Sequence, residues 1–363
     1  MGTAGAGAHA QKRGIALLIV MSIIVLLATM AFSFHDMVAS NLAIARKDVD
    51  RFAALQLARA GLNLAIMLVK MDQNFVRGDY TFLPDTAYAS RQAQSGVELT
   101  KLEQAYMLLS ASEASGMPLE HGTVAVKMRD EMARVNVNTT AIEASPKLLV
   151  NLLRTCNVRK RKKLVFSDTH AADDVSLQLA ASIKDWVDTD ATVTAPEGAE
   201  STWYSAQTPK YRPRNRPLES IDELMLVRHM DRSIMSGVPA NDRDPGSLGI
   251  RDFLTVYGST KVVNVNSAEP AVLKSIPGIM ESPNREKIVA DLVSRRPITS
   301  GMLNAILNEN DSSATAQASQ YLTTRSNMLR IRVTAHLGSF DGTLETVIVR
   351  EPSFIRFLYW REI

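Results

Sequence analysis

The sequence predicts an α+β protein in which a long N-terminal helix packs on an antiparallel sheet that carries a large helical insertion. Two observations support this prediction. A 20-residue apolar run near the N-terminus continues into a helical pattern, and strand-like segments lie on both sides of a long, mainly helical stretch. The expected organisation is a leader at 1–14, a membrane-spanning and amphipathic helix at 15–72, a first part of the sheet domain at 73–138, an inserted helical domain at 139–325 and closing strands at 326–363.

Composition limits the classes of function. The 363 residues are 46% hydrophobic and 22% charged, as in globular proteins, which excludes disordered and collagen-like chains. The 41 basic and 38 acidic residues leave a net charge of +3, too balanced for polyanion binding to organise the whole chain. A single cysteine, Cys156, excludes an internal disulfide framework and a multi-cysteine zinc site.

The apolar run from Ile15 to Phe34 has the length of a membrane span. Its 20 residues would extend ~30 Å as a helix, which is the hydrocarbon thickness of a bilayer. Lys12 and Arg13 precede it directly, and this charge distribution predicts a cytoplasmic N-terminus with the rest of the chain exported. A secretory signal peptide and a simple uncleaved anchor are the alternatives. The run is longer than a signal-peptide core, and no A-x-A cleavage site follows it.

The helical pattern continues beyond the apolar run. Apolar residues recur at steps of 3, 7, 4 and 3 at Phe52, Leu55, Leu62, Ile66 and Val69, which is the spacing of one helix face. No proline occurs before Pro84, and only a glycine at position 61 weakens the run. We therefore expect one helix from about Ile15 to about Met71.

Alternating apolar and polar residues predict the strands of the sheet. Two strands are expected at 123–128 and 133–137 with a turn near Asp130, and two more at 329–335 and 344–349 joined by 338–342. Because the first and second pairs are far apart in sequence, the region between them is the predicted insertion.

The junction between leader and helix, Lys12-Arg13-Gly14 before Ile15, resembles a class III, type IV pilin-like signal. The resemblance implies that a prepilin peptidase cleaves between Gly14 and Ile15. Most such proteins have Glu at the fifth mature position, whereas this chain has Ile19. That departure is typical of the minor pseudopilin K (GspK) family of type II secretion systems, which makes Ile19 the position expected to be specific to the fibre tip.

An internal repeat occurs within the chain. Arg134–Thr139 and Val262–Ser267 share the Val-Asn-Val-Asn pattern, which predicts a short strand followed by a helix capped by the hydroxyl of Thr139 or Ser267. The sequence after the second copy resembles a helix-hairpin-helix unit. Its hairpin, Gly278-Ile279-Met280, lacks the second glycine of the phosphate-binding G-x-G, so we expect the scaffold without the phosphate grip.

The basic run Arg159–Lys163 is interpreted as a solvated loop or helix end. No aromatic residues alternate with its cations, as base stacking would require, so a nucleic-acid patch is the less favoured interpretation.

The densest group of titratable residues follows this run. Five carboxylates lie within 16 residues, at Asp185, Asp188, Asp190, Glu197 and Glu200. Carboxylates at this density require a cation or full solvation, and oxygen ligands without His or Cys favour calcium. The EF-hand spacing is absent. A solvated acidic loop and a paired-carboxylate hydrolase site remain as alternatives.

The same segment starts an ordered series of motifs. Asp-Trp-x-Asp-x-Asp at 185–190 is followed by Gly-Ala-Glu at 198–200, Tyr-Arg-x-x-Asn-x-Pro at 211–217, Asp-Glu-Leu at 222–224, the second Val-Asn-Val-Asn copy and the closing strands. This order resembles the GspK family over nearly the whole chain. The resemblance implies a pseudopilin fold with a SAM-like, helix-hairpin-helix-like insertion and no enzymatic activity.

The resemblance also implies a function: a minor pseudopilin at the tip of the pseudopilus that initiates assembly and supports export across the outer membrane. The implied partners are the I and J minor pseudopilins, also H, the major pseudopilin, the prepilin peptidase and the inner membrane, with the bulk of the chain periplasmic and no nucleic acid bound. It further implies structural calcium, with Asp188, Asp190, Glu197 and Glu200 matching the family's motif and Asp185 as a fifth candidate.

Two other functions stay open from the sequence. One is a membrane-anchored helix-hairpin-helix protein that binds DNA during uptake. The other is a secreted hydrolase that uses the acidic cluster.

Overall fold

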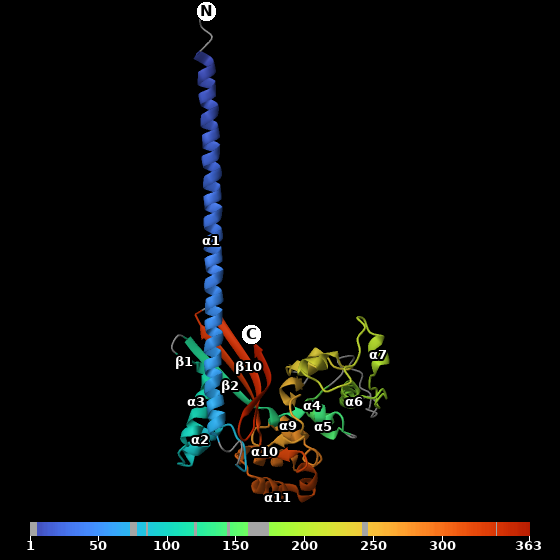
Figure 1. Cartoon of the computed structure of the whole chain (residues 1–363). Helices are drawn as coiled ribbons and strands as arrows, with labels where there is room; N and C mark the ends of the chain where they lie inside the picture. Colours follow the sequence, from blue (N-terminus) through green and yellow to red (C-terminus); the bar gives the residue numbers. More distant parts are fainter. Residues whose placement is uncertain are drawn as a thin grey trace, which may run out of the picture.

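The computed structural model describes residues 6–72, 78–84, 86–119, 122–143, 146–158, 174–241, 246–338 and 340–363. The basic run at 159–163 lies outside these residues. The chain forms a long helix, a sheet domain around the lower end of that helix, and a helical domain beside the sheet (Figure 1).

The sheet has five antiparallel strands in the order β1-β2-β9-β10-β11. They are β1 (Met117–Leu119), β2 (Gly122–Asp130), β9 (Met328–Leu337), β10 (Phe340–Arg350) and β11 (Ile355–Glu362). Three helices belong with the sheet, namely α1 (Ala6–Met71), α2 (Thr86–Gln94) and α3 (Lys101–Ser115). The predicted α+β class, with a long N-terminal helix on an antiparallel sheet, is confirmed.

The inserted part of the chain is mainly helical. Its helices are α4 (Val137–Thr140), α5 (Lys147–Thr155), α6 (Val175–Val187), α7 (Ser201–Ser205), α8 (Arg232–Ser236), α9 (Pro270–Ser275), α10 (Arg285–Ser294) and α11 (Ser300–Ala318). Short 3₁₀ turns are η2 (Glu131–Ala133), η4 (Ile221–Leu226) and η5 (Ile250–Phe253). Three two-stranded ladders pair β3 (Val135–Asn136) with β6 (Leu254–Thr255), β4 (Gly237–Val238) with β5 (Ser247–Leu248), and β7 (Val263–Asn264) with β8 (Leu322–Thr323).

Helix α1 ends at Met71, where the sequence pattern placed its end, but it begins at Ala6 and not near Ile15. The residues before Ile15 contain no proline, so nothing in them stops the helix. Among the described residues, α1 alone is long and apolar enough to cross a membrane, with a most apolar window of mean hydropathy 2.7 that is not buried anywhere in the structure. Its upper part stands clear of both domains (Figure 1).

The lower part of α1 packs on the sheet through small residues. Ala58, Leu62 and Ala65 are buried against Val124 of β2 and Val333 of β9. A Cβ at Gly61 would lie 2.5 Å from Val124 Cγ1 and 2.9 Å from Val333 Cγ1. The glycine that weakens the helix therefore permits its close approach to the sheet.

Replacing this glycine tests the contact. Gly61→Ala should lower the free energy of unfolding by about 1–2 kcal/mol, because an overpacking cost of ~1–3 kcal/mol exceeds the ~1 kcal/mol gain in helix propensity. The matched control is Gly301→Ala in α11, where no atom lies within 4 Å of the added Cβ, so stability should stay or rise by up to ~1 kcal/mol. Urea unfolding of the detergent-solubilised chain measures both, and an unchanged Gly61→Ala protein would contradict the contact.

One predicted hairpin is wrong. Strand β2 does not turn back on residues 133–137; it pairs with β9, with Val126 opposite Val333. Asp130 ends the strand because its side chain accepts the Met132 N–H at 2.8 Å and caps η2. Of the predicted second strand only Val135–Asn136 is extended, and it pairs in parallel with β6 inside the helical domain. The β9–β10 hairpin and the closing strand β11 are as predicted.

The repeated Asn residues, not the hydroxyls that follow them, cap the turns. Asn136 Oδ1 accepts the Asn138 N–H at 3.0 Å, and Asn264 Oδ1 accepts the Asn266 N–H at 3.1 Å. The predicted Thr139 cap is wrong, since its hydroxyl donates to the Asn136 carbonyl, and α9 is preceded by Glu269 rather than Ser267. Asn fits better because its amide also donates across the fold: Asn264 Nδ2 reaches Asp130 Oδ2 at 2.7 Å.

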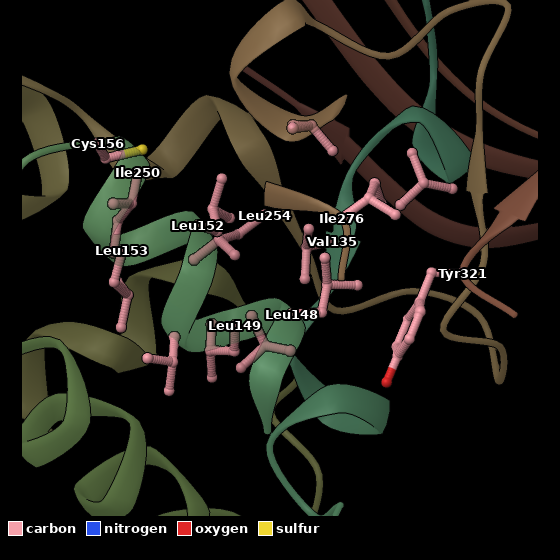
Figure 2. Packing of buried hydrophobic residues seen from close by; sticks show 14 of the residues in the cluster. Val135, Leu148, Leu149, Leu152, Leu153, Cys156, Ile250, Leu254, Ile276 and Tyr321 are labelled. Atoms are coloured by element: carbon pink, nitrogen blue, oxygen red, sulfur yellow. The ribbon is translucent and has the colours of Figure 1, made fainter. Parts of the chain in front are cut away.

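The helical domain has its own apolar core. Leu148, Leu149, Leu152 and Leu153 of α5 are fully buried there (Figure 2). Residues distant in sequence complete the cluster, among them Val135, Ile250, Leu254, Ile276 and Tyr321. The sheet and α1 form a separate core. The molecule therefore consists of two packed units joined where the chain leaves β2 and re-enters β9.

A buried ionic network lies at this junction. Glu131 of η2 is fully buried and accepts Arg330 Nε of β9 at 2.6 Å and the hydroxyl of Thr255 in β6. Arg330 also donates to Glu345 at 2.5 Å. Burial alone would lower the pKa of Arg330, but its bonds to Glu131 and Glu345 outweigh burial and raise it. The network fixes the first residues of the insertion to the sheet.

Candidate metal centre

The acidic loop begins where α6 ends. Asp174 caps the start of this helix by accepting the Ser176 N–H at 2.9 Å, and the chain becomes extended at Asp188. The side of α6 that faces the core is apolar. Asp188 directly follows the last turn of the helix and therefore lies at the edge of the domain. Residue Glu200, which immediately precedes α7, returns to the same edge.

Three of the five predicted ligands come together. Carboxylate oxygens of Asp188, Asp190 and Glu200 all lie within 4.8 Å of one another. Asp188 is half-buried, Asp190 is exposed and Glu200 is buried. Two ligands of one calcium ion at ~2.3–2.6 Å each are at most ~5 Å apart, so this spacing suits a shared ion.

The buried oxygens of this group have no hydrogen-bond partners within the described parts of the chain, whereas the exposed Asp190 accepts the Thr192 N–H at 2.7 Å. Asp188 Oδ1 and both carboxylate oxygens of Glu200 are buried without a hydrogen bond. Burial, followed by the nearby charges of Asp190 and Asp185, raises the pKa of Asp188 to about 6. Burial, followed by the charges of Asp185 and Asp188, raises the pKa of Glu200 to about 7. Buried, unpaired and mutually repelling carboxylates fit a cation site better than a solvated loop.

Asp185 has a different position. It is fully buried, and both its oxygens accept the Thr194 N–H, at 3.1 and 3.2 Å. A Cβ at Gly198 would collide with its carboxylate, so the glycine lets the loop close over Asp185. Asp185 thus ties the loop to α6 and adds negative charge next to the three-carboxylate group.

Glu197 turns away from the group. Its Oε2 lies 3.1 Å from Arg228 Nη2 and 3.5 Å from His229 Nε2. Its backbone adopts a positive φ of 54° at this point of the loop. Arg228 in turn lies over the ring of Trp203, 5.4 Å from the centroid. Glu197 therefore fixes its own part of the loop by an ion pair with Arg228.

Asn215 is a residue of this site that the sequence reasoning did not single out. Its amide nitrogen lies 3.4 Å from the Asp190 carbonyl, and its Oδ1 is buried without a hydrogen bond in the part of the chain that the structure describes. Its place in the Tyr-Arg-x-x-Asn-x-Pro motif was the available signal. An amide oxygen is a neutral donor of the kind that calcium accepts, which makes Asn215 a fourth candidate ligand beside the three carboxylates.

A cluster of four aromatic side chains packs beside the acidic loop. Tyr204 is fully buried, and its ring centroid lies 5.1 Å from Trp186, 4.9 Å from Trp203 and 5.2 Å from Tyr211. The Asn215 N–H donates to the Trp186 carbonyl at 3.0 Å. The cluster thus positions three motifs that are distant in sequence around one edge.

The helix-hairpin-helix segment does not present a phosphate site. Gly278 adopts a positive φ of 89°, and its N–H donates to the Glu281 carboxylate at 2.5 Å. A carboxylate thus occupies the position where a phosphate oxygen would bind. Gly278 also packs closely on α11, since a Cβ there would lie 2.7 Å from the Ala314 carbonyl. Gly278 therefore serves the packing of the hairpin on α11.

Residues 133–238 match the family model described as "Type II secretion system (T2SS), protein K". A curated relative, "Type II secretion system protein K" of Klebsiella pneumoniae, is 33% identical over 95 residues. That alignment covers 26% of this chain and 26% of the relative, so it spans about a quarter of each.

A solved structure matches over a greater length. It comes from the crystal structure of the GspK-GspI-GspJ complex from the enterotoxigenic Escherichia coli type 2 secretion system, with a TM-score of 0.62 and 17% identity. The match covers 88% of this chain and 99% of that chain. At this identity the likeness establishes the fold.

Proposed function

We propose that this chain, whose resemblance to the type II secretion minor pseudopilin K family these matches confirm, acts at the tip of a pseudopilus. The observation that carries the proposal is the architecture. One continuous helix joins a free apolar segment to an antiparallel sheet, and a helical domain enters and leaves that sheet at a single junction. A subunit of this shape can anchor in a membrane, pack along a fibre by its helix and present a separate domain beyond it.

The proposed location is the inner membrane. The apolar half of α1 spans the bilayer once, the N-terminus with Lys12 and Arg13 stays in the cytoplasm, and both folded domains lie in the periplasm. A prepilin peptidase acting on the cytoplasmic side removes residues 1–14.

Ile19 supports a place at the tip. A carboxylate at this depth costs ~2.5–3.5 kcal/mol in the membrane, which a subunit inside the fibre offsets by pairing with a neighbour's N-terminal amine. Ile19 is apolar and exposed on α1, so this subunit makes no such pair. A subunit that starts the fibre has no neighbour above it and therefore needs no such pair.

The proposed partners are the I and J minor pseudopilins, as in the complex from which the similar structure comes. Together they initiate assembly, followed by H and the major pseudopilin. The role is structural and not enzymatic. The three-carboxylate group binds calcium, which would neutralise Asp188, Asp190 and Glu200 and hold the loop closed without a disulfide.

Processing gives a direct test of this proposal. The mature chain should begin at Ile15, and Gly14→Leu should leave the precursor uncut, because the peptidase needs a residue without a side chain next to the bond. Gly7→Leu, a matched change elsewhere in the leader, should be cut normally. Intact mass measurement of the protein from peptidase-containing cells distinguishes these results, and a wild-type chain that keeps Met1 would contradict the proposal.

A further inference from the structure

The face of the sheet opposite α1 carries a concentration of positive charge. Residues of each strand alternate between the two faces, and those that lie under α1 are apolar. The alternate residues on the opposite face include five cations, namely Lys127 and Arg129 of β2, Arg330 and Arg332 of β9, and Arg361 of β11. Because the whole chain has a net charge of only +3, this concentration is local.

Like charges face each other across two strands of this face. Lys127 pairs in register with Arg332, and Arg129 pairs with Arg330. Residues directly opposite each other have Cβ atoms ~4.5–5.5 Å apart, and like charges in such positions destabilise a sheet. Burial, followed by the charge of Arg129, lowers the pKa of the Lys127 ammonium, and the charge of Arg332 lowers it further. A bound anion would remove this repulsion.

The chain's own carboxylates offset these cations only in part. Arg332 Nε lies 3.6 Å from Glu345, a carboxylate that already accepts Arg330. Arg129 Nη1 lies 3.4 Å from Asp252, whose side chain is 73% exposed. Arg361 forms no ion pair with a residue that the structure describes. Arg129, Arg332 and Arg361 can therefore contact an external anion.

These cations line a cleft between the sheet and the helical domain, which stands beside it (Figure 1). The cleft has a volume of about 480 Å³, within the range of ~300–1,000 Å³ that is typical of ligand sites. Its other wall includes Ile221 and Asp222 of η4 and Arg251 of η5. Arg251 is paired with Asp222, so the excess positive charge comes from the sheet. An anion in this cleft would contact both domains.

The cleft lies too far along α1 for the headgroups of the membrane that α1 spans. Gly61 packs on Val333, the neighbour of Arg332 in β9. From Phe34, where the apolar run ends, to Gly61 the helix rises ~40 Å at ~1.5 Å per residue. The headgroup region extends only ~5–8 Å beyond the hydrocarbon on each side. The anion therefore belongs to another molecule and not to a lipid.

The aromatic rings beside the cleft favour a peptide over a nucleic acid. Arg330 Cζ lies 5.6 Å above the centroid of the Tyr257 ring. Tyr359 packs against Tyr257 with ring centroids 6.1 Å apart. Base stacking requires a free ring face, and these rings contact the protein itself. The exposed guanidinium groups suit carboxylates, which they bind through two parallel hydrogen bonds.

The spacing of the cations matches an extended acidic peptide. Lys127 and Arg332 form one row across the strands, and Arg129 and Arg330 form the next. The rows are two residues or ~6.8 Å apart, which is also the distance between alternate side chains of an extended peptide. We propose that the cleft between the sheet and the helical domain, the basic cleft, binds an extended acidic segment of a protein partner with carboxylates at alternate positions. This inference goes beyond the proposed function, because it requires no place in a pseudopilus.

Fluorescence anisotropy with the detergent-solubilised full-length chain tests the basic cleft. The probe is a labelled, end-blocked octapeptide of alternating glutamate and serine, in about 0.15 M salt to screen exposed charges. An isomer with its four glutamates in one block should bind about threefold more weakly, because only two of them project to the same side. Equal binding of the isomers, no saturable binding, or tighter binding of an oligothymidylate with four phosphates would each overturn the proposal.

Matched variants locate the binding site of the peptide. Arg332→Gln combined with Arg361→Gln removes two exposed cations and should weaken peptide binding about tenfold. Arg46→Gln combined with Arg51→Gln is the control, since both residues are exposed on α1 and the net charge changes equally. This control should bind like the wild type, and thermal unfolding checks that both variants fold. Equal weakening by the two double variants would show attraction to net charge alone and would overturn the basic cleft.

Discussion

Calcium should raise the melting temperature of this protein well above its value in excess chelator. At free calcium 100 times the dissociation constant, mass action stabilises the folded state by ~2.7 kcal/mol. The physical reason is the group of Asp188, Asp190 and Glu200, whose buried oxygens lack hydrogen-bond partners among the described residues. Differential scanning fluorimetry of the detergent-solubilised chain in millimolar calcium and in chelator measures the difference.

Substitutions in the acidic loop show which carboxylates produce the calcium-dependent gain in melting temperature. Asp188→Asn combined with Glu200→Gln should abolish the calcium-dependent gain. Glu197→Gln is the matched control, because Glu197 pairs with Arg228 outside the three-carboxylate group, and it should keep the gain. Equal melting temperatures of the wild type in calcium and chelator would show that the loop is only acidic.

The pH dependence of the same gain follows from the two raised pKa values. The pKa of Asp188 is about 6 and that of Glu200 about 7, against ~4 in an unfolded chain. Between these limits the folded, calcium-free state binds more protons than the unfolded state, so its stability falls as pH rises through 6 and 7. Calcium removes this penalty, and its stabilising effect should therefore be larger at neutral pH than at pH ~5.

Glu131→Ala should have the largest effect of any single substitution at the junction of the two domains. Removing one partner of a buried ion pair costs ~3–5 kcal/mol. We expect about 3 kcal/mol, because Arg330 keeps its second partner Glu345 while Thr255 and Arg330 lose Glu131. Urea unfolding measures the loss, and limited proteolysis should show faster cleavage between sheet and helical domain.

The control for this substitution is an exposed ion pair. Glu113 of α3 pairs with Lys127 of β2 on the surface of the sheet domain. Glu113→Ala should cost no more than ~1 kcal/mol. If Glu131→Ala costs as little, the junction network does not hold the two domains together.

Local patterns predicted those elements whose partners are close in sequence. The C-terminal end of α1 followed from its apolar spacing, and the β9–β10 hairpin followed from two alternating segments with a short turn. The segment 133–137 alternates equally well, yet only Val135–Asn136 is a strand. Its partner Leu254–Thr255 is more than a hundred residues away, and the choice between β2 and β6 depends on packing that alternation does not encode.

The same limit applies to the prediction of the candidate metal site from the sequence. The density of carboxylates predicted a cation site in the loop, but not which oxygens converge. Glu197 instead contacts Arg228 and His229, which lie about thirty residues further along the chain. Asp185 accepts a hydrogen bond from the Thr194 N–H. Asn215 reaches Asp190 only because the aromatic cluster folds its motif back onto α6. These contacts follow from tertiary structure.

The proposed function is that of a minor pseudopilin that acts with two others. The most direct measurement is purification of the tagged full-length chain from membranes that contain the I and J pseudopilins of the same secretion system, followed by native mass spectrometry. The proposed function predicts one complex with single copies of the three proteins, each with a processed N-terminus. Recovery of the chain alone, under conditions in which I and J are present and processed, would contradict it.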